Sequence, residues 1–96
     1  MMRDITILVV DDESRMRKLI KDFFAAKDYN ILEAENGEKA LEIFETEKNK
    51  IKLILLDVMM PKLDGWSTLR QIRLVSQVPV IMLTARGEEQ DELFRI

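Results

Sequence analysis

Aspartates follow two separate apolar segments of this chain, and together they could bind a hard cation. Asp11 and Asp12 come directly after the apolar residues 5–10, and Asp57 comes directly after residues 53–56. Mg²⁺ prefers near-octahedral oxygen ligands and usually accepts one or two carboxylates besides waters and phosphate oxygens. A carboxylate can also act as a nucleophile and form an acyl phosphate. The residue types therefore predict a metal-dependent phospho-acceptor site with Asp57 as the nucleophile.

Alternating strands and helices must position these aspartates. The apolar runs at residues 5–10, 31–32, 53–56 and 80–83 have the length and the boundaries of buried parallel strands. Apolar residues at helical spacing follow Ser14, Asn36 and Asp64, and a last helix is predicted over residues 88–96. This order predicts an α/β fold, in which right-handed crossovers build a parallel sheet with helices on both faces.

The ends of three predicted strands carry polar side chains at one edge of the sheet. Ligands of open parallel sheets bind beyond the carboxyl ends of the strands. Thr84 ends the fourth strand, so its hydroxyl could donate to a phosphoryl oxygen on Asp57. Ala85 follows and is small enough to leave a donor room to approach. We therefore expect Asp11, Asp12, Asp57 and Thr84 to surround one pocket.

Each of these residues also has a purely structural interpretation. The acidic residues 11–13 could simply cap the following helix and favour its positive end. Asp57 alone could end a strand in a turn, and Thr84 alone is ordinary strand composition. The methionines at 59–60 are typical core residues, and Trp66 is expected to anchor the third helix by packing. The coincidence of three polar strand ends at one edge favours the functional interpretation.

Composition fits one small intracellular domain. The 96 residues are 47% hydrophobic, enough for a modest core. Fifteen Lys and Arg against 18 Asp and Glu give a net charge of -3, which argues against a nucleic-acid or anionic-membrane surface. The chain has no cysteine, which suits a reducing compartment. The first residues resemble neither a signal peptide nor a membrane span, so we expect a cytoplasmic protein.

Three motifs, in this order, resemble the receiver domain of bacterial two-component response regulators. They are ILVVDDE at residues 7–13, LLDVMMPKLDG at 55–65 and PVIMLTAR at 79–86. The resemblance implies a flavodoxin-like doubly wound sheet of order 2-1-3-4-5. It also implies phosphorylation by a sensor histidine kinase with Mg²⁺. The third motif and residues 69–73 look most like regulators whose output is a winged-helix DNA-binding domain.

The resemblance also assigns roles to individual residues. Asp57 matches the phospho-acceptor. Asp11 and Asp12 match the acidic pair that binds Mg²⁺, with Asp11 binding through a water. Met59 matches the position whose backbone carbonyl completes the metal site. Thr84 matches the switch hydroxyl that moves toward the phosphoryl group, and the domain is expected to act as a signalling switch rather than an enzyme.

The chain departs from the family at its C-terminal end. The family carries a fifth strand that ends in a phosphoryl-binding Lys, with an aromatic switch residue just before it and a fifth helix after it, and this sequence stops at Ile96. We therefore expect residues 1–96 to form a truncated receiver domain of sheet order 2-1-3-4, without an output domain. The missing Lys should weaken phosphoryl binding. An exposed fourth strand and a bared apolar face should favour self-association.

Three other functions are compatible with this fold class, and the residues at the strand ends bear on each of them. A nucleotide or FMN binder shares the fold class, but residues 11–13 would repel a phosphate. A phosphatase with an Asp nucleophile usually has a second Asp two residues later, where this chain has Met59. A phosphorylation-impaired fragment could act only as a protein-interaction or self-associating module.

Overall fold

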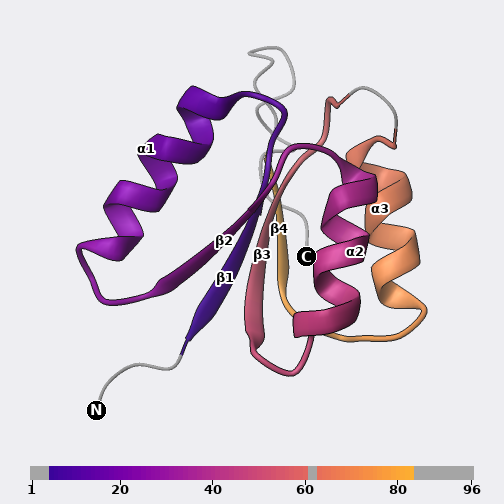
Figure 1. The fold of residues 1–96 in the computed structure, drawn as a ribbon. Coiled ribbons are helices and arrows are strands. Elements are labelled where there is room, and N and C mark those ends of the chain that lie inside the picture. The colour runs from indigo at the N-terminus through magenta and orange to yellow at the C-terminus, as the bar shows by residue number, and fades with distance from the viewer. Residues whose placement is uncertain (1–4, 61–62, 84–96) are drawn as a thin grey trace.

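The computed structural model describes residues 5–60 and 63–83, which form a parallel sheet with helices on both faces (Figure 1). The strands are β1 (Thr6–Val10), β2 (Asn30–Ala34), β3 (Ile51–Asp57) and β4 (Val80–Leu83). The helices are α1 (Ser14–Ala25), α2 (Gly37–Glu47) and α3 (Gly65–Arg73). The four described strands lie in the order β2-β1-β3-β4, as expected, and all neighbouring pairs are parallel. The helix expected over residues 88–96 lies outside the described residues.

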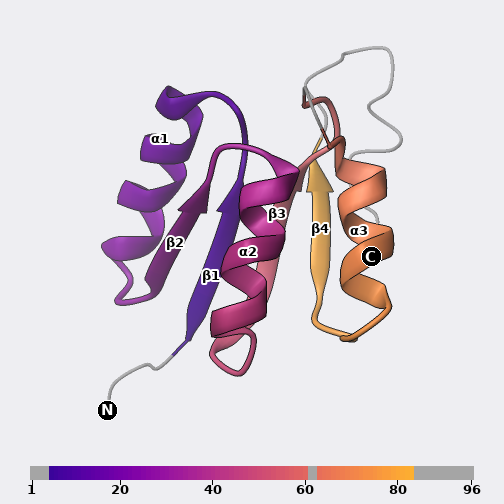
Figure 2. The same cartoon turned by 45° about the vertical axis from the view of Figure 1, so that its right-hand side comes forward.

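The three helices of the described residues lie on both faces of the sheet. Figure 2 shows α2 and α3 on one face and α1 on the other. Alternate side chains of β1 serve the two faces, because successive residues of a strand point to opposite sides. Leu8 and Val10 pack in the cluster with α2 and α3, whereas Ile7 and Val9 pack toward α1. This explains why β1 is apolar from Ile7 to Val10 and buried along its whole length.

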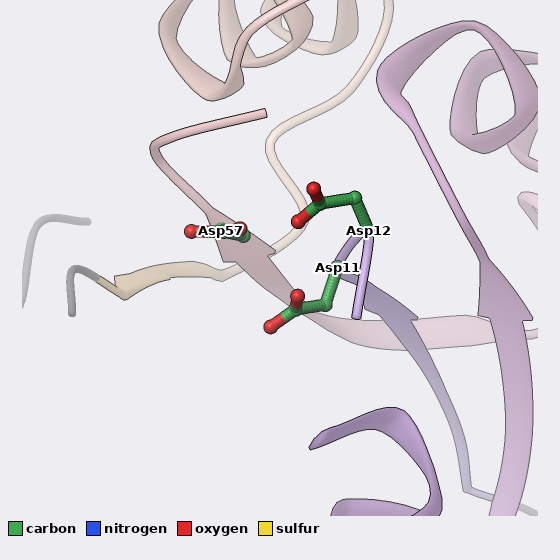
Figure 3. Close-up of side chains that lie close together, drawn as sticks. All are labelled: Asp11, Asp12 and Asp57. Carbon is green, nitrogen blue, oxygen red and sulfur yellow. The ribbon is translucent and has the colours of Figure 1, made fainter. Parts of the chain in front are cut away.

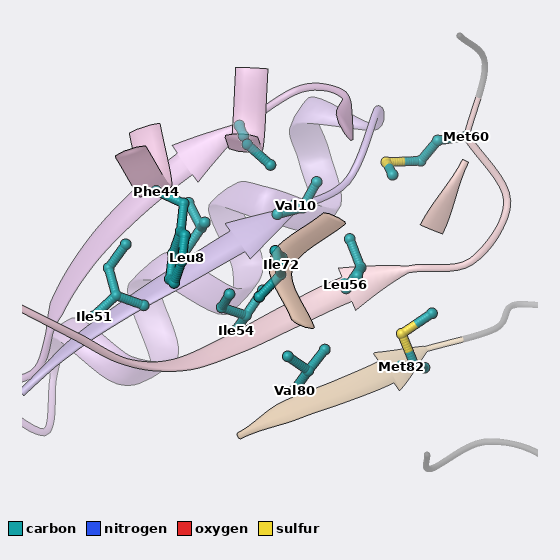
Figure 4. Close-up of a cluster of buried hydrophobic side chains, with 12 residues drawn as sticks. Leu8, Val10, Phe44, Ile51, Ile54, Leu56, Met60, Ile72, Val80 and Met82 are labelled. Atoms are coloured by element: carbon teal, nitrogen blue, oxygen red, sulfur yellow. The ribbon is translucent and has the colours of Figure 1, made fainter. Parts of the chain in front are cut away.

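The larger core lies between the sheet and the helices α2 and α3 (Figure 4). Leu8, Ile54 and Leu56 of the sheet are fully buried there, against Phe44 of α2 and Ile72 of α3. Each such aliphatic side chain contributes about 1.5–3 kcal/mol by leaving water. This core fixes the central strands and therefore the positions of their carboxyl ends.

Fewer apolar side chains of α1 are buried against the sheet than the helical spacing predicts. Ile20 and Phe24 pack against the sheet, but Met16, Leu19 and Phe23 are exposed. The apolar stripe of α1 is thus wider than the part of it that touches β1 and β2. The spacing identified the helix correctly, but spacing alone does not determine how much of a stripe is covered.

The predicted helix starts agree with the structure, whereas two predicted strands are too short. The predicted caps are confirmed: the side chain of Asn36 accepts from the Lys39 N–H at 2.8 Å, and that of Asp64 accepts from the Ser67 N–H at 2.8 Å. Both β2 and β3 extend beyond the predicted 31–32 and 53–56. Polar residues such as Glu33 and Lys52 lie inside these strands and interrupt the apolar pattern.

Exposure in the structure corrects two expectations about large apolar residues. Trp66 is 41% exposed, so it is not the packed anchor of α3 that was expected; Ile72, which is fully buried, has that role. Of the two methionines at 59–60, Met60 is buried in the core and Met59 is exposed. No helix in the described ranges combines the length and the apolar character needed to cross a membrane.

Candidate metal and phospho-acceptor site

Three carboxylates meet at the carboxyl ends of β1 and β3. Asp11 and Asp12 follow β1, and Asp57 is the last residue of β3 (Figure 3). One carboxylate oxygen from each of the three lies within 4.8 Å of the others. The predicted convergence of these aspartates is therefore observed. The donor set is all oxygen and lies close enough together to surround a single hard cation.

Partial burial and the neighbouring negative charges both disfavour the ionised form of the Asp57 carboxylate. Partial burial is the main cause that raises its pKa to about 6, and the negative charges of Asp11 and Asp12 raise it further. The Met59 N–H opposes this shift by donating to Asp57 Oδ1 at 3.1 Å. At neutral pH the carboxylate is still mainly ionised. A cation at the cluster would remove the repulsion between the carboxylates.

Three polar atoms of Asp11 take part in hydrogen bonds that fix its position. Its N–H donates to the Ala34 carbonyl at 3.1 Å, and its Oδ1 accepts from the Glu13 N–H at 2.9 Å. Its own carbonyl accepts from Arg17 Nη1 at 2.7 Å. Partial burial raises the pKa of its carboxyl, and the charges of Asp12 and Glu13 act in the same direction. Residues 11–13 do not act simply as a helix cap. Glu13 is the N-cap residue of α1, but its side chain makes no capping hydrogen bond among the described residues.

Gly65 brings α3 against the backbone of Asp57. A Cβ at this position would collide with the Asp57 carbonyl oxygen and lie 2.8 Å from Val58 Cα. The Gly65 N–H donates to the Val58 carbonyl at 3.1 Å, which ties the start of α3 to the end of β3. The missing side chain is therefore what allows the helix to approach the site.

Comparison with known proteins identifies the family. A family model described as the response regulator receiver domain matches residues 7–94. The chain belongs to this family. CpxR of Escherichia coli (strain K12), a transcriptional regulatory protein, is 45% identical over 87 residues, covering 91% of this chain and 36% of that protein. The chain thus spans about a third of the length of this relative.

Solved receiver structures agree with this assignment. A response regulator receiver domain protein from Clostridium thermocellum superimposes with a TM-score of 0.81 at 33% identity, over 91% of this chain and 70% of that one. CheY of Borrelia burgdorferi, in a CheX–CheY–BeF3–Mg complex, gives a TM-score of 0.80 at 32% identity, over 90% and 66% of the two chains. These matches show the CheY-like flavodoxin fold of receiver domains.

Of the remaining predicted site residues, the structure describes Met59 but not Thr84 or Ala85. Met59 lies beside the carboxylates because its N–H donates to Asp57 Oδ1, and the residue is 48% exposed. Thr84 and Ala85 lie outside the described residues. The structure therefore brings together Asp11, Asp12 and Asp57, with the Met59 backbone next to them.

Sequence reasoning missed Arg17, Glu33 and Gly65. Arg17 contacts both Asp11 and Glu33, and Gly65 allows α3 to approach Asp57. One signal for Arg17 was available, because a cation near the positive N-terminal end of a helix is unfavourable unless it has a partner. Its partners come from other elements, so the sequence alone did not reveal them.

Proposed function

We propose that this receiver domain is a phospho-acceptor switch, phosphorylated on Asp57 by a sensor histidine kinase in the cytoplasm. The observation that carries the proposal is the convergence of three carboxylates at the carboxyl ends of β1 and β3. Family membership supports it, because receiver domains work with histidine kinases or other phosphotransfer partners.

In the proposed transfer step the phosphoryl group moves directly from the kinase histidine to Asp57. A carboxylate oxygen of Asp57 attacks the phosphorus of a phosphohistidine, an O–P bond forms, and the P–N bond breaks. The electron pair returns to the imidazole of the kinase, which is left as a neutral ring after it takes up a proton. The protein contributes mainly positioning and charge compensation, which dominate phosphoryl transfer.

Mg²⁺ suits the donor set of this site. Asp11, Asp12 and Asp57 would hold it. The family resemblance adds the backbone carbonyl of Met59 as a further oxygen ligand. When bound, Mg²⁺ supplies positive charge that lets an anionic carboxylate and an anionic phosphoryl group approach each other. Thr84 would donate to the phosphoryl group as the switch hydroxyl, with Ala85 lining the pocket.

The output of the switch is proposed from the relatives. CpxR is a transcriptional regulatory protein, and this chain corresponds to about a third of its length. We propose that phosphorylation controls transcription through a winged-helix output domain that is not contained in these 96 residues.

Titration with a phosphoryl mimic tests the proposal. Beryllofluoride is added with Mg²⁺ while the fluorescence of Trp66 is followed. Trp66 is the only tryptophan and is adjacent to Gly65, which touches the Asp57 backbone. We expect a saturable change that requires both reagents and that Asp57→Asn abolishes.

A matched variant makes the result specific. Asp28→Asn makes the same chemical change at an exposed turn, where the positive φ of 70° is well tolerated by Asn. This control should respond like the wild-type chain. A folded wild-type protein that gives no response, or an Asp57→Asn variant that responds normally, would contradict the proposed phospho-acceptor role.

Self-association is a second candidate function, favoured by the surface of α1. Met16, Leu19 and Phe23 are 40%, 66% and 57% exposed and belong to one apolar stripe. We propose that a second copy of this chain covers the stripe, because exposed apolar patches favour association. Light scattering during size-exclusion chromatography should give a dimer mass, which Leu19→Lys should shift toward the monomer. A monomer at high concentration would refute this candidate.

A further inference from the structure

Arg17 joins the acidic site to the edge strand β2. It lies in α1, and its side chain is only 17% exposed although it carries a charge. Its Nη1 donates to the carbonyl oxygen of Asp11 at 2.7 Å, and its Nε donates to Glu33 Oε1 at 3.0 Å. The planar guanidinium can direct two donors at fixed angles, which an ammonium group cannot do.

Glu33 is itself held from both sides. Its Oε2 lies 3.6 Å from Lys21 Nζ, so its two oxygens are shared between Arg17 and Lys21. Glu33 lies in β2, directly before Ala34, whose carbonyl accepts the Asp11 N–H. The edge strand therefore restrains the Asp11 peptide twice: directly through Ala34, and indirectly through Glu33 and Arg17.

The restraint on the Asp11 backbone acts against the repulsion between the three carboxylates. Without a cation, the carboxylates of Asp11, Asp12 and Asp57 repel one another at oxygen separations within 4.8 Å. The loop that carries Asp11 and Asp12 could relieve the repulsion by turning away from Asp57. Arg17 makes this motion costly because its bond is to the backbone of the loop, which moves with both aspartates.

We propose that Arg17, oriented by Glu33, is a positioning residue that holds the Asp11–Asp12 loop in its metal-binding geometry before the cation arrives. The inference rests on the proposed function, since it assumes that the two aspartates bind Mg²⁺. Arg17 contacts a backbone carbonyl rather than a carboxylate, so it acts through the loop and does not itself bind the cation. Partners of this kind typically change metal affinity by about 10–100-fold.

Mg²⁺ titrations followed by Trp66 fluorescence test the proposal on four variants of the full chain. Arg17→Met keeps much of the aliphatic volume but removes both donors, and we expect Mg²⁺ affinity to fall about tenfold. Arg15→Met is the matched control, because Arg15 is exposed on the same helix. Glu33→Ala should resemble Arg17→Met, whereas Glu33→Gln keeps an acceptor for Nε and should rescue most of the affinity.

The combination of variants separates positioning from general destabilisation. If Glu33 acts through Arg17, the Arg17→Met/Glu33→Ala double variant should bind Mg²⁺ no more weakly than the weaker single variant. Faster hydrogen exchange at the Asp11 and Asp12 amides in Arg17→Met, with unchanged exchange in the core strand β3, would support a local effect. If Arg17→Met does not fold, Glu33→Ala and Glu33→Gln provide the same comparison.

The measurements distinguish a failure of the Arg17 proposal from a failure of the proposed metal site. Equal Mg²⁺ affinities for Arg17→Met and Arg15→Met, with a wild-type chain that binds normally, would overturn the positioning role and leave the proposed function intact. A folded wild-type chain that does not bind Mg²⁺ would overturn the metal site, and the role of Arg17 with it. Additive losses in the double variant would show that Glu33 does not act through Arg17.

Discussion

Val10 of β1 pairs with Leu56 of β3, and an aspartate follows each of these two residues in the chain. Because the strands are parallel, the register that buries the two apolar side chains also places Asp11 beside Asp57. The stability of the core thus maintains a cluster of like charges that would otherwise separate. The cluster of three carboxylates at this edge is a direct consequence of strand register.

The charge cluster should lower the stability of the cation-free protein. Replacing Asp57 by Asn removes a carboxylate whose pKa is raised to about 6, while keeping its shape. That shift corresponds to at most about 3 kcal/mol at pH 7. Because the group is partly exposed, solvent screening reduces the expected gain in unfolding free energy to about 1 kcal/mol. Urea denaturation without Mg²⁺ measures it, with Asp28→Asn as the control that should change little.

The same shift predicts the pH dependence of stability. The pKa of Asp57 is about 6 in the folded chain against 3.8 as the unperturbed value, so the folded state binds more protons between these values. Stability should therefore fall as pH rises from about 4 to about 6, and Asp11, whose pKa is also raised, acts in the same direction. Asp57→Asn should flatten this part of the curve. A difference between wild type and variant that is independent of pH would contradict the assignment.

A side chain at position 65 should disturb both stability and the site. In Gly65→Ala the new methyl group meets backbone atoms of Asp57 and Val58, which cannot rotate away as a side chain could. Overpacking of this kind costs about 1–3 kcal/mol, more than the gain of up to about 1 kcal/mol in helix propensity. We expect net destabilisation in thermal unfolding and weaker Mg²⁺ binding.

Gly37→Ala provides the comparison for position 65. Its methyl group would meet Thr68 Oγ1 and the Leu63 carbonyl, so it should also destabilise the fold. It does not touch Asp57, and Mg²⁺ affinity in the folded variant should change less than in Gly65→Ala. Equal losses of affinity in the two variants would argue against a specific contact of α3 with the site.

Loss of the α2 cap should reduce stability without affecting the acidic site. Asn36→Ala removes the acceptor for the Lys39 N–H, and substitutions of this type cost about 1 kcal/mol. Asn49→Ala, in the exposed connection before β3, should be nearly neutral. Chemical denaturation compares the two, and a cap variant as stable as the loop variant would be inconsistent with the observed hydrogen bond.

Local signals in the sequence were enough for much of the fold. A mainly apolar run predicted β1, and the capping residues Asn36 and Asp64 located two helix starts, because both effects depend only on neighbours in the chain. Strand ends were harder to predict. Glu33 is accommodated in β2 because Arg17 and Lys21 pair with it there, although its charge argues locally against a strand.

The amino-acid sequence by itself determined the order of strands and helices, the acidic strand ends and the family resemblance built on them. Only the tertiary structure decided which apolar residues of α1 are covered, since coverage depends on the helix's position over the sheet. It also decided that Arg17 reaches Asp11 and Glu33, and that α3 approaches Asp57 at Gly65. These contacts join residues that are distant in the chain, and their energies depend on a geometry that no local pattern specifies.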